Sequence, residues 1–230
     1  MLKYLFGASL AAGVVYLVVK LRDSEPESLG LNGHRAQPID GIPNGRRTNE
    51  GYVLGAMIDP DHAAILYANG IRLVMSAKRP TDSTIGTIRA AGMRWVGIPM
   101  SDTFLHECAI LDLSAQVAPQ TVFIHCQHGA DRAGSTIAFL LVANHGWSIP
   151  DALYSVIHPV DSDVNGLSDV LREFGYPVKH VGERGVGMYS LGAGRGGLKA
   201  RNDRYKELIR STIYSMRNIP DFRSAGCGSG

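Results

Sequence analysis

The fold is organised around one stretch, His125-Cys126-Gln127-His128-Gly129-Ala130-Asp131-Arg132-Ala133-Gly134-Ser135. Before it, residues 121–124 are mainly β-branched and aromatic, which predicts a buried strand. After it, residues 135–143 are almost uninterrupted apolar sequence, which predicts a buried helix that ends at Gly146. A loop that joins a strand to a helix in this way points backbone N–H groups at the positive end of the helix dipole. The stretch therefore predicts a site for an anion.

Two side chains give this loop a specific chemistry. Cys126 lies at the mouth of the predicted anion site, where a helix N-terminus and a guanidinium group both favour an ionised thiol. Arg132 can return over the loop and offer a planar fork to two phosphate oxygens. A thiolate beneath a phosphate held in this way is placed for in-line attack on phosphorus, which forms a phosphocysteine intermediate. We expect His125 to orient the loop by hydrogen bonding and to help keep the cysteine ionised.

The pattern His-Cys-x5-Arg, with Gly129 third after the cysteine, resembles the signature loop of the cysteine-dependent protein tyrosine and dual-specificity phosphatases. Residues 70–74 and 97–100 resemble two core strands of the compact dual-specificity group, and the HCQHGADR loop is similar to that of a bacterial branch. The resemblance covers roughly residues 45–175, an ordinary domain size. It implies catalysis without a metal or cofactor. It also implies that the substrate phosphate is bound by Gln127, His128, Gly129, Ala130, Asp131 and Arg132.

Two aspartates compete for the role of general acid, which protonates the leaving oxygen and then activates water. Asp102 precedes the nucleophile by 24 residues, and its alternative role is to cap a helix over about residues 104–118. Asp131 lies inside the loop, as in some family branches that are thought to use this position. Its alternative role is an ion pair or a hydrogen bond that braces the loop. The sequence leaves the choice between the two open.

One position departs from the family pattern. The family usually has Ser or Thr directly after the arginine, where the hydroxyl assists the cysteine as a leaving group, but this chain has Ala133. Ser135 and Thr136 follow deeper in the predicted helix. The departure predicts slow hydrolysis of the phosphocysteine or a partly degraded enzyme.

The rest of the sequence alternates predicted strands with predicted helices. Strands are expected at 51–55, 71–76 and 93–98, with helices ending at 68 and 91 and a last domain helix at 168–174. This alternation predicts an α/β fold whose central, mainly parallel sheet is flanked by helices. The cysteine loop then follows a strand at its carboxyl end, where open α/β sheets bind ligands.

We expect four segments along the chain. Residues 1–22 hold a long uncharged stretch bounded by basic residues, which predicts an N-terminal transmembrane helix and therefore a membrane location, with the side undetermined. Residues 23–45 predict a linker and 46–178 the phosphatase domain. Residues 179–230 predict a glycine-rich segment and a basic amphipathic helix over 202–217. This helix could dock on the domain, lie on a membrane or bind a partner, and docking is the simplest of the three.

Composition excludes some other functions. A formal net charge of +2 and the absence of long basic runs argue against a nucleic-acid partner. The three cysteines show neither a metal-binding spacing nor a disulfide framework, and Cys108 is expected to be a packing residue or a resolving thiol for Cys126.

The sequence therefore predicts hydrolysis of phosphomonoesters, on phosphoproteins (Tyr and Ser/Thr) or on a phosphoinositide or other small phosphate. A phosphate-binding pseudophosphatase and a different cysteine enzyme, such as a sulfur transferase or an arsenate reductase, stay open as alternatives.

Overall fold

The computed structural model describes residues 36–98, 100, 105–156, 164–176 and 195–228. Within them lies a six-stranded sheet in the order β1-β2-β3-β6-β4-β5. Strands β3, β6, β4 and β5 are parallel, and β1 and β2 add an antiparallel edge. The sheet is therefore mixed, with the predicted parallel arrangement in four of its strands. The bounds are β1 Gln37–Pro38, β2 Arg46–Arg47, β3 Val53–Gly55, β4 Leu73–Ser76, β5 Arg94–Gly97 and β6 Val122–His125.

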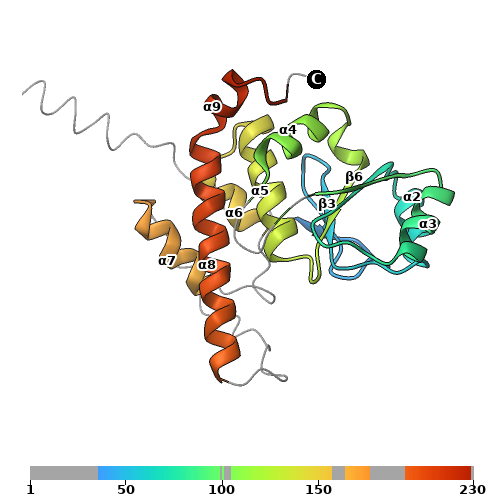
Figure 1. Cartoon of the computed structure of the whole chain (residues 1–230), viewed down its shortest axis with the longest axis horizontal. Coiled ribbons are helices and arrows are strands. Elements are labelled where there is room, and N and C mark those ends of the chain that lie inside the picture. The colour runs from blue at the N-terminus through green and yellow to red at the C-terminus, as the bar shows by residue number, and fades with distance from the viewer. Residues whose placement is uncertain (1–35, 99, 101–104, 157–163, 177–194, 229–230) are drawn as a thin grey trace, which may run out of the picture. The chain divides into compact units, whose positions relative to one another are not determined.

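Helices cover both faces of this sheet (Figure 1). Helices α2 and α3 lie on one side, and α4, α5 and α6 lie on the other, with α8 running alongside α5. The described helices are α2 His62–Ala68, α3 Asp82–Ala90, α4 Glu107–Ala115, α5 Asp131–His145, α6 Ile149–Val156, α7 Val164–Glu173, α8 Arg195–Arg217 and α9 Ile219–Ser224, with a 3₁₀ turn at Pro119–Thr121. The predicted α/β fold with helices on both faces of the sheet is confirmed at this level.

The two layers follow from the alternation of side chains along the strands. Successive residues of a strand point to opposite faces, so each strand feeds two cores. One core joins the sheet to α2 and α3 through Val53, Val74 and Phe123. The other joins it to α5 through Leu54, Met75 and Ile124.

Helix α5 is the central element of the second core. It begins at Asp131, inside the quoted stretch, and most of its residues are buried. Gly146 ends it in the left-handed conformation with φ +69°, as the sequence predicts. Because β6 and α5 are both buried, the loop between them is anchored at each end.

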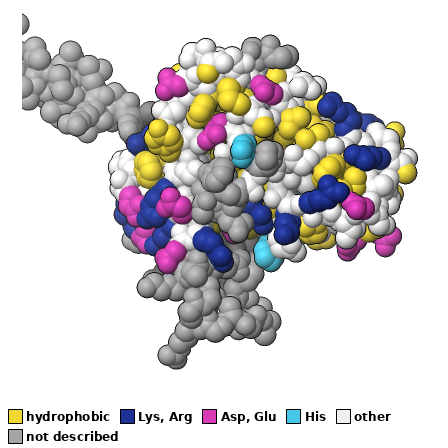
Figure 2. Space-filling view, viewed as in Figure 1, with side chains coloured by type: hydrophobic (Ala, Val, Ile, Leu, Met, Phe, Trp, Pro, Cys, Tyr) yellow, Lys and Arg dark blue, Asp and Glu magenta, His cyan; other side chains and the backbone are white. Residues whose placement is uncertain are grey.

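Helix α8 packs against α5 and α7, which favours docking on the domain among the three roles considered for this segment. It begins at residue 195, seven residues before the predicted start. All the apolar residues that predicted its amphipathic face are buried, Leu208 included. Four of them lie in the same core as α5: Tyr205, Ile209, Ile213 and Met216. In Figure 2, positive and negative side chains are intermixed on the side where Figure 1 places α7 and α8.

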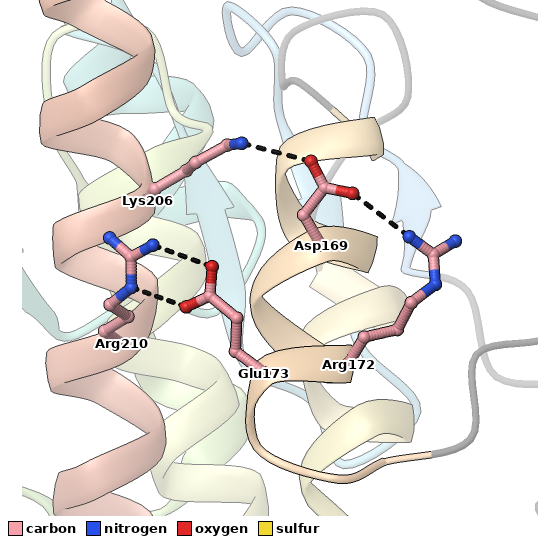
Figure 3. Close-up of polar contacts among 5 residues, drawn as sticks. All are labelled: Asp169, Arg172, Glu173, Lys206 and Arg210. Atoms are coloured by element: carbon pink, nitrogen blue, oxygen red, sulfur yellow. Dashed lines mark hydrogen bonds and ion pairs between the residues drawn. The ribbon is translucent and has the colours of Figure 1, made fainter.

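Exposed ion pairs join α8 to α7 (Figure 3). Arg210 on α8 donates two hydrogen bonds to the Glu173 carboxylate, at 2.8 and 2.9 Å. The Lys206 amine lies 3.1 Å from the Asp169 carboxylate. The guanidinium of Arg172, on the same helix as Asp169, lies 3.0 Å from that carboxylate. Pairs as exposed as these contribute little to stability, so the buried apolar seam holds α8 in place.

A disulfide joins Cys108 on α4 to Cys227, which follows α9, with the two Cα atoms 4.9 Å apart. The expectation that Cys108 is a packing residue or a resolving thiol is therefore wrong. The two cysteines are 119 residues apart in the chain, so no local spacing could indicate the pair. Among the described residues Cys126 is the free cysteine.

The predicted membrane location is contradicted. In the part of the chain that the structure describes, no helix combines the length and the apolar character needed to cross a bilayer. The segment predicted as the anchor, residues 1–22, lies outside the described residues, as does most of the glycine-rich stretch predicted over 181–197. The last three residues of that stretch begin α8. Strand β1 lies within 23–45, the range predicted as a linker, so the sheet includes part of that range.

Candidate active site

The loop 126–130 begins where β6 ends at the carboxyl edge of the sheet, and it leads into the first turn of α5. Cys126 is buried, with 3% of its surface exposed. The backbone N–H of Gly129 donates to its sulfur at 3.3 Å. The loop therefore curls over the cysteine and turns at least one amide hydrogen toward it, at the positive end of α5.

Only glycine fits at position 129. Its φ of +74° lies in the left-handed region, which other residues adopt at a cost. A Cβ atom there would lie 2.3 Å from the carbonyl carbon of Gly55 and 2.5 Å from the nitrogen of Ala56. The turn that brings this amide to the sulfur thus depends on a close approach between the loop and the end of β3.

Three residues from two neighbouring segments hold the loop from outside by its carbonyl oxygens. The backbone N–H of Met57 donates to Gln127 O at 3.2 Å. The side chains of Asn44 and Arg46 donate to His128 O and Gly129 O, each at 2.7 Å.

His125 lies in a buried chain of hydrogen bonds beneath the loop. Its Nε2 is 2.6 Å from Ser76 Oγ, which also accepts a hydrogen bond from Trp95 Nε1 at 2.8 Å. Its Nδ1 lies 3.3 Å from Cys126 O. Since the indole can only donate, the Ser76 hydroxyl is free to donate to Nε2, which leaves the His125 proton on Nδ1. The ring is then suited to orient the Cys126 backbone.

Burial shapes the electrostatics of this histidine. Loss of solvent lowers the pKa of His125 to about 4, a change that the hydrogen bond to the Cys126 carbonyl opposes. The ring is therefore neutral at physiological pH. The expected orienting role fits this geometry, whereas help by a positive charge in keeping the cysteine ionised does not.

Arg132 lies in the first turn of α5 and is half-buried. Its guanidinium donates to the carbonyl of Ala77 at 3.3 Å, directly after β4. Strand β4 is the neighbour of β6, so this contact brings the guanidinium back over the edge of the sheet from which the loop starts. The arginine and the cysteine of the signature thus belong to one site.

The other predicted site residues divide into three groups. Gln127 and His128 are exposed at the loop, while Gly129 and Ala130 are buried within it. Asp131 is the first residue of α5 and half-buried. Asp102 lies outside the described residues. The described residue nearest to it in sequence, Met100, has its sulfur 3.5 Å from the Thr136 hydroxyl.

The residue directly after Arg132 carries no hydroxyl, and the next hydroxyls along α5 belong to Ser135 and Thr136. Ala133 is fully buried. Thr136 donates its hydroxyl to Arg132 O at 2.9 Å, one turn back along α5. The buried Ser135 hydroxyl has no hydrogen-bond partner among the described residues. The departure at Ala133 therefore has no visible compensation in α5.

Sequence reasoning missed Asn44, Arg46, Ser76 and Trp95. Asn44 stands in the range predicted as a linker and Arg46 at the first position of the predicted domain, whereas Ser76 and Trp95 stand in predicted strands. Their hydrogen bonds reach residues 19 to 84 positions away along the chain. A faint signal exists in Asn44 and Gly45, a pair typical of turns, directly before the arginine.

No group of three or more His, Cys, Asp and Glu side chains within the described ranges is arranged to hold a metal ion. The chemistry available at the site is that of the thiol, the guanidinium and the loop amides.

Comparison with known proteins gives matches among solved structures. No family model matches the chain, and no curated protein sequence matches it. TpbA of P. aeruginosa matches with 22% identity and a TM-score of 0.49, over 58% of this chain and 84% of that one. The catalytic core of the PP-IP phosphatase SIW14 of S. cerevisiae matches with 16% identity and a TM-score of 0.47, over 59% and 87%.

PTPMT1 matches with 17% identity and a TM-score of 0.44, over 79% of this chain and 98% of that one. TpbA has also been solved with pTyr, and PTPMT1 with PI(5)P. At this level of similarity the chemistry of the site has to be judged from its own residues. In its signature loop the chain resembles the cysteine-dependent protein tyrosine and dual-specificity phosphatases.

Proposed function

We propose that this chain hydrolyses phosphomonoesters through a phosphocysteine intermediate on Cys126. The observation that carries the proposal is the hydrogen bond from the Gly129 N–H to the Cys126 sulfur, at the N-terminus of α5. An amide that points at the sulfur stabilises negative charge there, whether on the thiolate or on a phosphate above it. The half-buried Arg132 supplies the positive charge that a dianionic phosphate requires.

The proposed reaction has two steps. In the first, the Cys126 thiolate attacks phosphorus, the S–P bond forms and the bond to the leaving oxygen breaks, while a general acid protonates that oxygen. In the second, water gives a proton to the same carboxylate as its oxygen attacks phosphorus, and the S–P bond breaks to return the thiolate and inorganic phosphate. Arg132 and the loop amides bind the non-bridging oxygens in both steps.

We propose Asp102 rather than Asp131 as the acid. Asp131 opens α5, where the helix dipole favours an ionised carboxylate, whereas an acid must hold a proton. The other candidate that the sequence offers is Asp102, 24 residues before the nucleophile.

A separate test distinguishes the two carboxylates. We expect Asp102→Asn to slow hydrolysis of alkyl phosphates, whose leaving oxygen needs a proton, far more than that of activated aryl phosphates. We expect Asp131→Asn to slow both substrates alike and by less. The reverse pattern would assign the acid to Asp131.

The proposed substrates are phosphoproteins that carry phosphotyrosine or phosphoserine and phosphothreonine, and the alternative is a phosphoinositide or another small phosphate. Gln127 and His128 are exposed on the loop and are placed to contact the group that bears the phosphate. Phosphate release from phosphotyrosine peptides, phosphothreonine peptides and phosphoinositide vesicles, measured side by side, separates these classes.

Ala133 favours a second candidate function, a phosphate-binding pseudophosphatase. Without a hydroxyl at this position, the cysteine is a poorer leaving group in the second step. We expect Ala133→Ser to increase steady-state turnover several-fold and to lower the amount of phosphoenzyme trapped by acid quenching. A chain that binds phosphopeptides but releases no phosphate, with or without this change, would favour the pseudophosphatase.

The main test is hydrolysis of a generic aryl phosphate by the full chain. We expect Cys126→Ser to lower turnover by at least about 10³-fold, since a serine hydroxyl is not ionised at neutral pH. The matched control is Cys227→Ser, which also removes a sulfur but lies outside the site. Turnover that survives Cys126→Ser would refute the proposal.

A further inference from the structure

We propose that Asn44 and Arg46 are positioning residues that aim the amides of the cysteine loop at the substrate phosphate. This inference deepens the proposed function and rests on it. It assigns a role in phosphate binding to a segment outside the signature loop, in which Asn44 precedes β2 and Arg46 begins it.

The argument starts from the geometry of the peptide group. In a trans peptide the carbonyl oxygen and the following N–H point in opposite directions. Asn44 Nδ2 holds the carbonyl of His128 from outside the loop at 2.7 Å. The N–H of the same peptide belongs to Gly129, and it is the one that donates to the Cys126 sulfur at 3.3 Å. The amide of Asn44 and the sulfur thus hold one peptide at its two ends.

The neighbouring peptides are held in the same way. Arg46 Nη2 donates to Gly129 O at 2.7 Å, so the N–H of Ala130 points away from Arg46. The backbone N–H of Met57 donates to Gln127 O at 3.2 Å, which sets the N–H of His128. Three consecutive loop peptides are each held by their carbonyl from outside the loop, which leaves their three N–H groups for the opposite side.

Asn44 and Arg46 also hold each other. Arg46 Nη1 donates to Asn44 Oδ1 at 3.3 Å, which fixes the orientation of the asparagine amide so that its NH₂ group faces His128 O. Arg46 is buried, with 4% of its surface exposed. Asn44 has φ +51°, a conformation that asparagine tolerates better than most residues.

The orientation of the loop peptides decides whether a positive N–H group or a negative carbonyl oxygen faces the sulfur. If the peptide between His128 and Gly129 rotates, its carbonyl oxygen replaces its N–H beside the sulfur. An attractive interaction with a thiolate or phosphate then becomes a repulsive one. The hydrogen bonds from Asn44 and Arg46 oppose this rotation, so they act on phosphate binding without touching the phosphate.

The test compares three variants of the full chain. Asn44→Asp keeps the size and backbone preference of the side chain but replaces its donor with an acceptor that repels His128 O. Arg46→Met keeps the apolar stem and removes every donor. The matched control is Arg47→Met on the same strand, because Arg47 also donates to two carbonyls, those of Gly51 and Asn69, which lie away from the loop.

Two readouts do not depend on turnover. The first is direct binding of inorganic phosphate to the full chain. We expect this binding to weaken by roughly tenfold in Asn44→Asp and Arg46→Met. The second is the rate of alkylation of Cys126 by iodoacetamide at neutral pH, which we expect to fall in both variants. We expect Arg47→Met to leave both unchanged.

The proposal is overturned if Asn44→Asp and Arg46→Met change phosphate binding and alkylation no more than Arg47→Met does. Where Arg46→Met unfolds the chain, Asn44→Gly provides the decisive comparison, since glycine adopts the same φ and lacks the amide. A wild-type chain that binds phosphate without hydrolysing it refutes the proposed function alone and leaves this comparison intact.

Discussion

The cysteine loop and the α7–α8 contact are held in opposite ways. The loop is held by hydrogen bonds between neutral carbonyls and donors from distant segments, of which that from Arg46 is buried. The α7–α8 contact combines a buried apolar seam with exposed ion pairs such as that between Arg210 and Glu173, whose side chains are 36% and 47% exposed. One arrangement fixes the direction of particular atoms, and the other fixes only the proximity of two helices.

The contacts that aim the loop amides therefore differ from the contacts that stabilise the folded chain. Hydrophobic burial is non-directional, and exposed ion pairs are weak and screened by salt. Neither could aim an amide at a sulfur. We therefore expect changes at the loop to affect catalysis more than folding, and changes at the C-terminal helices to affect folding more than catalysis.

The largest effect is expected from Arg132→Lys. A lysine keeps the charge but cannot place two donors in one plane against a phosphate, so we expect turnover of aryl phosphate to fall by about 10³-fold with little change in the unfolding midpoint. The matched control is Arg210→Lys on α8, where the same substitution should leave turnover unchanged. A fall of less than about tenfold in Arg132→Lys would show that the loop tolerates a point charge.

The next effect concerns the disulfide at the C-terminal end. Cys227→Ser opens a link between residues 119 positions apart, and we expect the free energy of unfolding to fall by about 2–4 kcal/mol. Urea unfolding of the wild type with and without a dithiol reductant is the matched measurement, and the reductant should have no effect on the variant. A large loss of turnover at temperatures where the variant stays folded would contradict the expectation that changes at the C-terminal end affect folding more than catalysis.

A comparable effect on stability is expected from acid at His125. Its pKa is about 4 in the folded chain because of burial, against an ordinary value of 6.5. As pH falls from about 6.5 to 4, the unfolded chain takes up a proton that the folded chain refuses, so stability is lost in that window and levels off below it. The difference corresponds to roughly 3 kcal/mol.

Urea unfolding at several pH values measures this loss. In His125→Gln, the free energy of unfolding should fall less steeply between pH 6.5 and 4, because the contribution of the imidazole is removed. An unchanged slope in this variant would mean that other groups account for the acid sensitivity.

The smallest effect is expected from Glu173→Gln. Hydrogen bonds from Arg210 hold the pKa of Glu173 below its usual range, so the contribution of this pair is present above that range and is lost as pH falls through the lowered value. Because both side chains are exposed, we expect only a slight change in the unfolding midpoint at neutral pH, which added salt should abolish. A loss of stability in Glu173→Gln as large as that in Cys227→Ser would mean that the ion pairs, and not the apolar seam, hold α8 in place.

The parts of the fold that sequence predicted well are local. The strand at 122–125, the loop and α5 are encoded in one continuous stretch, with Gly129 and Gly146 marking its two turns. Helix α2 and the Thr81 cap of α3, whose side chain accepts from the Thr84 N–H, follow from short patterns of the same kind.

The parts that sequence missed depend on contacts between distant residues. The hydrogen bonds of Asn44 and Arg46 to the loop cross 84 and 83 positions of the chain, and the cysteine pair crosses 119. No periodicity records such distances. The neutrality of His125 was missed for a related reason, because it arises from burial beneath a loop rather than from its neighbours in sequence.

The cysteines of this chain place conflicting demands on the surrounding medium. Cys126 has to remain a thiol to act as a nucleophile, whereas Cys108 and Cys227 have to remain oxidised to join α4 to the C-terminus. A buffer rich in dithiothreitol protects the first and cuts the second, and an aerated buffer does the opposite. Preparations that differ only in reductant will therefore contain two different molecules, and a measured rate has meaning only alongside a count of free thiols.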